Sequence, residues 1–114
     1  MGNFREGAPK ECLVTGCPVS YTLSIVGGKW KWIIVSLISQ NGVIRYGKLK
    51  DRLPKIAHKT LSQQLKELEK DGIIHREQYN QVPPKVEYSL TQKGRTLIPI
   101  LDLMSRWGEE NRAK

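Results

Sequence analysis

The sequence predicts a mainly helical fold that is completed by a small β-hairpin. Leucines recur at three- and four-residue spacing in the otherwise polar segment 58–72, which is typical of an amphipathic helix. Polar and apolar residues alternate strictly in Lys85–Leu90, which is typical of a strand with one buried face. The 114 residues are enough for one domain with its own core, and few enough for a partner subunit to complete it.

Two helices are expected at the start of the domain. Cys17-Pro18 opens the first, because proline is well tolerated at the first helical position, and Gly27-Gly28 ends it. The second helix runs from about Lys29 to Ile38. Its apolar residues recur at helical spacing and share one face. They are Trp30, Ile33, Ile34, Leu37 and Ile38.

Asn41-Gly42 is a strong turn signal, and the segments beyond it are short. Val43–Arg45 is expected to form a very short strand, and a third helix follows over about 46–53. The leucine-bearing helix is expected over about 57–71, with Gly72 as a left-handed cap at its end. Its leucines would face the core, and polar side chains would cover the opposite face.

A β-hairpin and a C-terminal helix complete the expected fold. The hairpin, about 73–90, has strands on either side of a turn that contains Pro83-Pro84. Thr91 can then cap a helix that runs to about Asn111, and Pro99 would kink this helix or divide it in two. The last three of the four helices before the hairpin, followed by the hairpin itself, describe a winged helix-turn-helix. Residues 1–10 are expected to form a flexible arm, and residues 11–114 the domain.

The composition favours a polyanion as partner. The chain has 19 Lys and Arg against 11 Asp and Glu, a net charge of +8, and this excess attracts nucleic acid or an anionic surface. A merely soluble basic protein is the alternative. Residues 1–10 contain no apolar core of a signal peptide, and the apolar segment 32–38 is far shorter than the about twenty residues that span a bilayer. A cytoplasmic location without a membrane partner is expected.

Several motifs along the chain are familiar. They are Cys17-Pro18-Val19, Gly27-Gly28-Lys29-Trp30, Arg45-Tyr46, residues 65–72, and above all the block Val-Pro-Pro-Lys-Val-Glu-Tyr-Ser-Leu-Thr-Gln-Lys-Gly at 82–94. In this order they resemble the HxlR family of bacterial transcription regulators, a MarR-like group of dimeric winged helix-turn-helix proteins. The resemblance runs from Cys17 to about Trp107, and the block at 82–94 is its most specific part.

The chain departs from the family at the start of the leucine-bearing helix. The family usually has a serine cap where this chain has Ala57, and alanine cannot accept the N–H bonds that serine would, a loss of about 1 kcal/mol. His58 is the candidate to replace that cap.

The resemblance implies that the helix at 57–71 is a recognition helix that enters the major groove of DNA. Lys59, Thr60 and Gln63 are the predicted base contacts, because lysine bonds guanine acceptors, glutamine matches adenine, and the threonine methyl meets thymine. A solvated helix face is the alternative. The predicted contacts to the DNA backbone, including the wing, are Ser62, Lys66, Arg45, Lys48, Arg76, Asn80, Gln81 and Lys85. For Arg76, pairing with Glu87 is an equal alternative.

The C-terminal helix carries a wide apolar band. It includes Leu97, Ile98, Leu101, Met104 and Trp107, more surface than one small domain easily covers. A homodimer through the N- and C-terminal helices is therefore predicted, which suits a two-fold operator. The alternative is that the band folds back on the core of its own chain.

The two cysteines are candidates for sensing. Cys17 lies at the expected helix N-cap, where the partial positive charge favours the thiolate and makes the sulfur nucleophilic. The family resemblance implies a sensor of oxidants or electrophiles at this cysteine. Cys12 has no counterpart in the family motif, but it lies close enough in the sequence to act as a resolving partner. The alternative is a buried cysteine that acts as a small apolar residue.

The sequence supports neither an enzyme nor a cofactor. The two cysteines and two histidines lack the paired spacing of a zinc site, and no phosphate-binding loop or nucleophile motif is present. The favoured function is a sequence-specific, redox- or electrophile-responsive DNA-binding regulator. Two alternatives are a ligand-gated regulator with inert cysteines and a winged-helix module that binds a protein.

Overall fold

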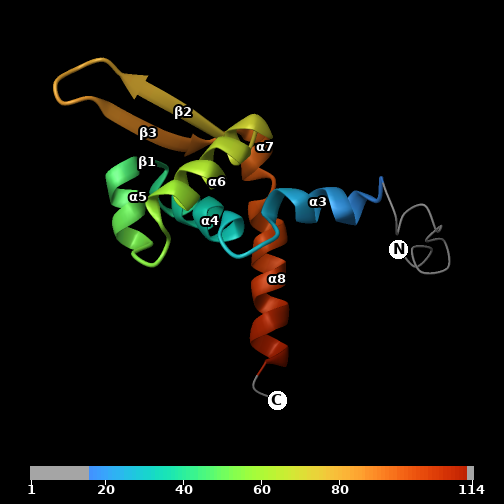
Figure 1. Ribbon diagram of the computed structural model, residues 1–114. Helices are drawn as coiled ribbons and strands as arrows, with labels where there is room; N and C mark the ends of the chain where they lie inside the picture. The colour runs from blue at the N-terminus through green and yellow to red at the C-terminus, as the bar shows by residue number, and fades with distance from the viewer. Residues whose placement is uncertain (1–15, 113–114) are drawn as a thin grey trace.

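The computed structural model describes residues 16–112, which form six helices and one three-stranded sheet (Figure 1). The helices are α3 (Pro18–Val26), α4 (Lys31–Asn41), α5 (Tyr46–Arg52), α6 (His58–Lys70), α7 (Gln92–Arg95) and α8 (Ile98–Asn111). The strands are β1 (Val43–Arg45), β2 (Ile74–Tyr79) and β3 (Lys85–Leu90). A mainly helical winged helix-turn-helix fold is thus confirmed. The predicted arm at 1–10 and Cys12 lie outside the described residues.

Helix α4 begins two residues later and ends three residues later than its pattern predicts. The turn after α3 continues through Gly28, whose φ of 82° is left-handed, so the next helical residue is Lys31. At the other end the Asn41 side-chain amide donates to the Leu37 carbonyl oxygen at 2.8 Å, which extends the last turn to Gly42.

Helix α6 has the predicted buried stripe but not the predicted cap. Its three leucines, Leu61, Leu65 and Leu68, are buried, and Gly72 has a φ of 77° just beyond its end. No side chain caps the helix at Ala57. The expectation that His58 replaces the cap is wrong, because its Nδ1 is hydrogen-bonded to the Tyr46 hydroxyl instead.

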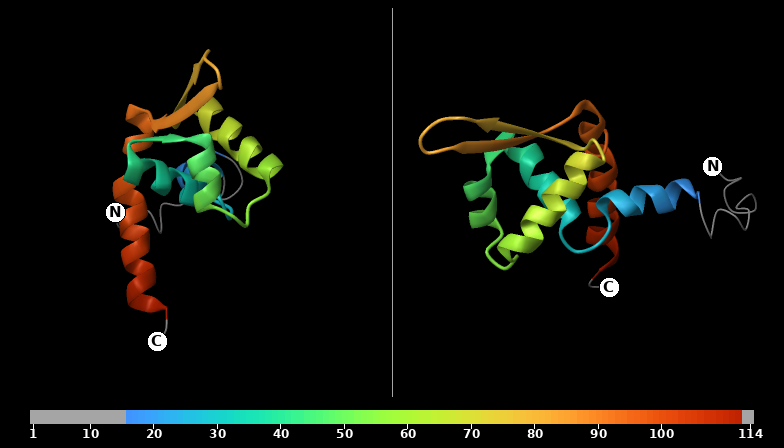
Figure 2. Two further views of the ribbon diagram at one scale, coloured as in Figure 1. Left: turned by 90° about the vertical axis from the view of Figure 1, so that its left-hand side faces the viewer. Right: turned by 45° about the horizontal axis from the view of Figure 1, so that its top comes forward.

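The sheet places β3 between the two other strands, and both pairings are antiparallel. Ile44 of β1 lies opposite Tyr88, and Ile74 of β2 lies opposite Leu90. The far ends of β2 and β3 project beyond the helices as a wing (Figure 2). The sequence predicts the short strand β1 but not its partner. Because β1 pairs with β3, it joins the wing to the body of the domain.

Two helices replace the single predicted C-terminal helix, so Pro99 lies at a division and not at a kink. Pro99 occupies the first turn of α8, where its missing N–H has no intrahelical partner to lose. The shorter helix, α7, begins as predicted at Thr91, whose hydroxyl oxygen accepts from the Gly94 N–H at 2.9 Å.

The turn between α6 and β2 is clamped from α7. The Thr91 hydroxyl donates to the Gly72 carbonyl oxygen at 2.6 Å. Lys93 Nζ donates both to the Asp71 carbonyl oxygen and to the Tyr21 hydroxyl, each at 3.0 Å, so it also links α3 to this turn. A side chain at Gly94 would place Cβ 2.2 Å from the Ile73 carbonyl oxygen, which explains why a glycine follows the lysine.

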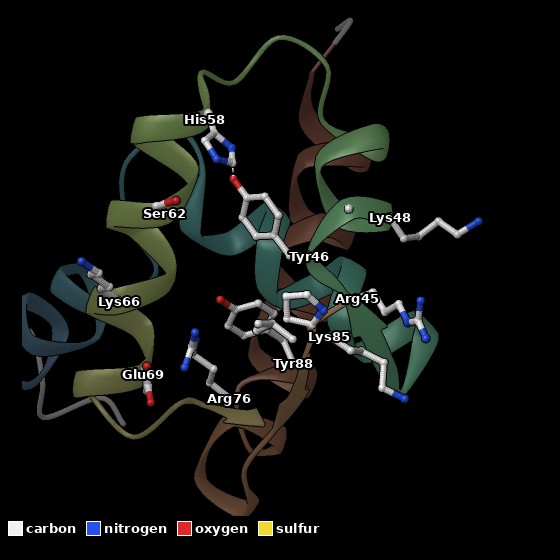
Figure 3. Close-up of a pocket in the computed structure, with 13 residues that line it drawn as sticks. Arg45, Tyr46, Lys48, His58, Ser62, Lys66, Glu69, Arg76, Lys85 and Tyr88 are labelled. Atoms are coloured by element: carbon white, nitrogen blue, oxygen red, sulfur yellow. Dashed lines mark hydrogen bonds between the residues drawn. The ribbon is translucent and has the colours of Figure 1, made fainter. Parts of the chain in front are cut away.

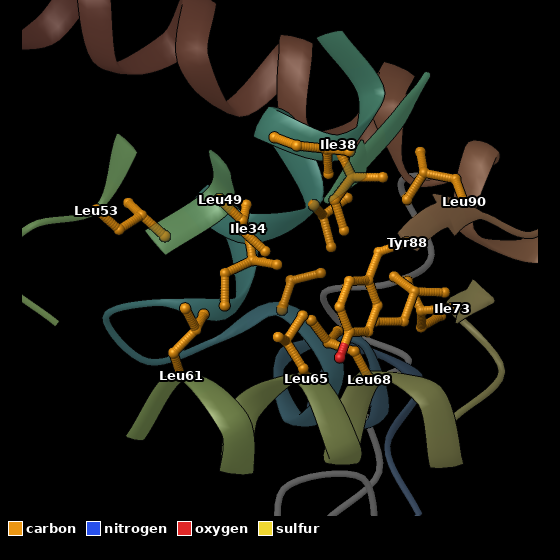
Figure 4. Packing of buried hydrophobic residues seen from close by; sticks show 14 of the residues in the cluster. Ile34, Ile38, Leu49, Leu53, Leu61, Leu65, Leu68, Ile73, Tyr88 and Leu90 are labelled. Carbon is orange, nitrogen blue, oxygen red and sulfur yellow. The ribbon is translucent and has the colours of Figure 1, made fainter. Parts of the chain in front are cut away.

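A single apolar core fills the space between α4, α5, α6 and one face of the sheet (Figure 4). Tyr88 of β3 reaches across it toward the leucines of α6, with its hydroxyl at the edge. The core fixes α6 against the sheet, so the exposed face of α6 and the wing keep a defined spacing. Within residues 16–112, none of the helices has the length and apolarity to cross a membrane.

Candidate nucleic-acid interface

The outer edge of α6 carries a row of polar side chains opposite the leucines. Lys59, Gln63, Lys66 and Lys70 are all exposed, while Thr60 and Ser62 on the flanks are half-buried. Because the leucines are committed to the core, this row is the part of α6 that a partner can reach. The predicted base contacts Lys59 and Gln63 therefore lie together, and Thr60 lies at their margin.

A hollow of about 940 Å³ lies between α5, α6 and the wing (Figure 3). Each of five elements, β1, α5, α6, β2 and β3, contributes one cationic residue to its lining, against one acidic residue, Glu69. The Arg76 side chain points into the hollow, whereas those of Arg45, Lys48 and Lys85 extend away from it (Figure 3). The five cations are Arg45, Lys48, Lys66, Arg76 and Lys85. With Ser62, the hollow brings together six of the eight residues predicted to meet a DNA backbone. The other two, Asn80 and Gln81, are exposed at the tip of the wing.

The centre of the hollow contains a tyrosine–histidine pair that the sequence does not announce. The Tyr46 hydroxyl and His58 Nδ1 are hydrogen-bonded, and the two rings meet edge to face with centroids 5.1 Å apart. These residues are the first of α5 and the first of α6, so the contact ties the two helices of the helix-turn-helix together. When the hydroxyl donates to Nδ1, Nε2 carries the ring proton and can donate to an anion.

Arg76 faces the hollow because of the strand register. Arg76 lies opposite Tyr88, whereas Glu77 lies opposite Glu87, so Arg76 and Glu87 point to opposite faces of the hairpin. The alternative that Arg76 pairs with Glu87 is therefore wrong. Arg76 instead donates to the Gln78 side-chain oxygen at 3.2 Å. Burial raises the pKa of Tyr88, and hydrogen bonding to Arg76 opposes that rise.

Lys85 lies on the wing strand beside groups that hold its ammonium. Its Nζ is 4.5 Å from the centroid of the Tyr79 ring and 3.6 Å from a carboxylate oxygen of Glu87. Tyr79 and Glu87 share the face of the hairpin that lies opposite Arg76, so these contacts hold the Lys85 ammonium on that face.

Gln63 is held by a carboxylate of α6 that is itself paired with a lysine of α4. Its Nε2 donates to Glu67 Oε2 at 2.9 Å, and Glu67 Oε1 lies 2.7 Å from Nζ of Lys31, the first residue of α4. The hydrogen bond from Gln63, and then the Lys31 ammonium, lower the pKa of Glu67 below its ordinary value of 4.5. The four-residue spacing of Gln63 and Glu67 could have indicated their contact, whereas Lys31 is too distant in sequence to be found in this way.

The predicted dimerisation band divides into two parts. Leu97 is buried, and the partly buried Ile98 and Leu101 pack against the core, so these three join α8 to the domain of its own chain. Met104 and Trp107 are exposed, Trp107 by 69%. Two residues that the band omitted, Ile100 and Leu103, are exposed beside them at helical spacing. The exposed stripe of α8 thus consists of Ile100, Leu103, Met104 and Trp107.

Helix α3 also exposes apolar side chains, Val19, Tyr21 and Leu23. Cys17 is its N-cap, as predicted, and is buried with 6% of its surface exposed. Cys17 is disulfide-bonded in this structure, and the other cysteine of the chain, Cys12, lies outside the described residues. Among residues 16–112, no three His, Cys, Asp or Glu side chains gather as a metal site would require.

Comparison with known proteins agrees with this geometry. The family model described as HxlR-like helix-turn-helix matches residues 25–114. The chain is 54% identical to the "Uncharacterized HTH-type transcriptional regulator BH0655" of Halalkalibacterium halodurans, over 82% of this chain and 83% of that protein.

Two solved structures are also similar. One is the redox regulator HypR in its oxidised form, with 52% identity, a TM-score of 0.76, and 86% of this chain and 100% of that chain covered. The other is the reduced form of the transcriptional regulator YodB from Bacillus subtilis, with 30% identity, a TM-score of 0.76, and coverage of 87% and 97%. BH0655 and YodB are thus named as transcriptional regulators, and HypR as a redox regulator.

Proposed function

Because the chain belongs to the HxlR-like helix-turn-helix family, it is a transcription regulator, and we propose that it binds a specific DNA operator as a homodimer whose occupancy responds to oxidation. Helix α6 enters the major groove, and the wing follows the flanking backbone. The observation that carries the proposal is the hollow beside α6, whose lining includes one cationic residue from each of five elements.

The hollow suits a phosphate backbone. Phosphate contacts fix the register of a protein on the duplex, and base contacts then supply the sequence preference. In the proposed complex, Arg45, Lys48, Lys66, Arg76 and Lys85 meet phosphates, while Lys59 and Gln63 on the outer edge of α6 reach base edges. Asn80 and Gln81 at the wing tip approach the minor groove or its flanks, and Thr60 offers its methyl group to thymine.

The proposed homodimer pairs the exposed apolar surfaces of the terminal helices. The stripe on α8 and the apolar side chains of α3 lie outside the core and away from the hollow (Figure 1). Burying them against a second copy removes apolar surface from water and presents two recognition helices to a two-fold operator.

Oxidation is proposed to act through Cys17. One similar structure is the redox regulator HypR in its oxidised form, and another is YodB treated with diamide. Cys17 lies at the N-cap of α3, and it occurs in a disulfide here, which is the oxidised state of a thiol. Because α3 is also proposed to join the dimer, a change at Cys17 alters the spacing of the two recognition helices.

The first test measures the salt dependence of binding to a duplex from the chain's own upstream region, located by footprinting. If a dimer neutralises about eight phosphates, affinity falls by about three to five powers of ten between low and near-physiological salt. Lys66→Ala and Arg76→Ala should each weaken binding to all duplexes about equally and reduce the salt slope by about 1 per lost contact. Arg106→Ala on α8 is the matched control, and a protein-binding module would show neither a steep slope nor a preferred site.

A second test addresses the effector. Cys17→Ser should abolish the change in operator occupancy that diamide causes in the wild type, because the hydroxyl cannot form a disulfide. Footprints of both proteins with and without diamide provide the measurement. A full response in Cys17→Ser would instead support a ligand-gated regulator with inert cysteines.

A further inference from the structure

The side-chain amide of Gln63 has one orientation in this structure. A carboxylate only accepts hydrogen bonds, so the group that Gln63 turns toward Glu67 Oε2, at 2.9 Å, is its NH₂. The carbonyl oxygen of the same amide therefore points away from Glu67. An unrestrained glutamine could present either side to a partner, whereas this one cannot turn over without placing two acceptors in contact.

Glu67 is itself anchored and not a mobile surface side chain. Its other oxygen, Oε1, lies 2.7 Å from Lys31 Nζ, and the Lys31 side chain is only 12% exposed. Lys31 belongs to α4, which the core fixes against α6, so the ammonium is held by a different element from the one that carries Gln63. The carboxylate cannot rotate without losing contact with Gln63, Lys31 or both.

We propose that Glu67, anchored by Lys31, is a positioning residue that sets the base preference of Gln63 by holding its carbonyl oxygen toward the major groove. An outward acceptor requires a donor on the base, and adenine and cytosine carry an amino group in that groove, whereas guanine and thymine present acceptors there. The second N–H of the same amide stays available for adenine N7. The inference rests on the proposed insertion of α6 into DNA, and it adds which bases Gln63 accepts.

The proposal explains an otherwise costly feature of the interface. Glu67 places a negative charge on the recognition helix next to a polyanion, which opposes phosphate binding. The ion pair with Lys31 offsets the negative charge of Glu67. The other carboxylate oxygen accepts from Gln63 and orients its amide, which explains why a carboxylate is present here.

The test is base preference at every position of the operator, measured by competition with single-base-pair variants. In the wild type, one base pair in each half-site should prefer adenine or cytosine on the strand that Gln63 reads, by roughly tenfold over guanine or thymine. Gln63→Ala should abolish this preference at that base pair. Glu67→Gln keeps the size but lets both amides turn over, so it should reduce the same preference to about twofold or less while other positions keep theirs.

Glu69→Gln is the matched control. It removes the same charge two residues away, on the hollow side of α6, without touching Gln63, so it should change affinity but not base preference. Lys31→Met is a second variant that retains Glu67 and removes its anchor. It should also reduce the base preference at the base pair that Gln63 reads. Thermal unfolding of each variant verifies that it is folded.

The outcomes separate the two proposals. If Gln63→Ala abolishes the base preference at one base pair and Glu67→Gln leaves that preference intact, the positioning role of Glu67 is overturned while DNA reading by α6 stands. If Lys31→Met keeps the full preference, the anchoring role of Lys31 is overturned. If Gln63→Ala and Lys59→Ala both leave operator binding unchanged, the proposed docking of α6 itself fails.

Discussion

At the residue scale, the charged side chains of α6 divide between two sides of the helix. Lys66 lines both the hollow and the smaller depression next to Gln63, while Glu67 belongs to the second and Glu69 to the first. The two carboxylates therefore have different surroundings, although they are two residues apart in the sequence. One holds a predicted base contact, and the other faces the cations of the hollow.

The lowered pKa of Glu67 predicts a dependence of stability on pH. A carboxyl group whose pKa is lower in the folded than in the unfolded chain stabilises the fold above its unfolded pKa, and this contribution is lost as the pH falls through the folded value. The difference in stability between the wild type and Glu67→Gln should therefore shrink as the pH is lowered from neutral to well below 4.5. Urea unfolding of both proteins across this range is the measurement, and a difference that stays constant would contradict the assignment.

Sequence reasoning at this scale finds the exposed residues better than their partners. The leucine spacing alone predicts that Lys59, Gln63 and Lys66 face outward, and they do. It cannot find Lys31, because that residue meets Glu67 only after α4 and α6 have packed. Nor can it predict the contact of His58 with Tyr46, which depends on the angle between two helices.

At the scale of elements, three residues of the α7 turn constrain the backbone between α6 and β2. Thr91, Lys93 and Gly94 all meet this backbone. These residues end the sequence block that is most specific to the family. Their spacing has a physical reason. The Thr91 hydroxyl and the Lys93 ammonium each donate to a carbonyl oxygen of the turn, and a side chain at Gly94 would collide with a third.

Gly94→Ala should destabilise the protein. Its Cβ would lie 2.2 Å from the backbone oxygen of Ile73, so the turn or α7 must move, at a cost of about 1–3 kcal/mol. Gly108→Ala in α8 is the control, since its Cβ meets nothing within 4 Å and should stabilise the helix by roughly 0.5–1 kcal/mol. Denaturant unfolding measures both, and equal stabilities of the two variants would argue against a close contact at Gly94.

The order and type of the elements could be predicted, but their ends and neighbours could not. Proline, glycine and alternating patterns place helices α3 and α5 and both wing strands to within a residue or two. The pairing of β1 with β3 and the register that separates Arg76 from Glu87 depend on contacts across the sheet, which no local pattern specifies. The late end of α4 depends on one side-chain hydrogen bond from Asn41.

At the scale of the whole molecule, the two proposed functional surfaces lie on different parts of the fold. The cationic hollow opens beside α6 and the wing, whereas α8 extends away from the domain with its apolar stripe exposed (Figure 2). In the proposed complex, this separation leaves one surface for a second copy and the other for DNA. Cooperation between them then depends on how rigidly α8 joins the core through Leu97, Ile98 and Leu101.

Leu103→Glu should convert the proposed dimer to a monomer. The substitution places a charge in the middle of the stripe, where association would have to bury it without a partner. Ser105→Glu adds the same charge on the opposite side of α8 and should leave the dimer intact. Sedimentation at several protein concentrations distinguishes the two states, and a Leu103→Glu variant that remains dimeric would place the interface elsewhere.

The outer strand of the sheet has a further consequence. β2 forms one edge, and five of its six residues are exposed, including His75, Arg76 and Glu77, two of which form the 2.9 Å His75–Glu77 pair. An edge so rich in ionisable groups is a poor template for strand addition by another molecule. Copies bound at neighbouring operators should therefore not associate through their wings, because the β2 edges do not pair into a continuous sheet.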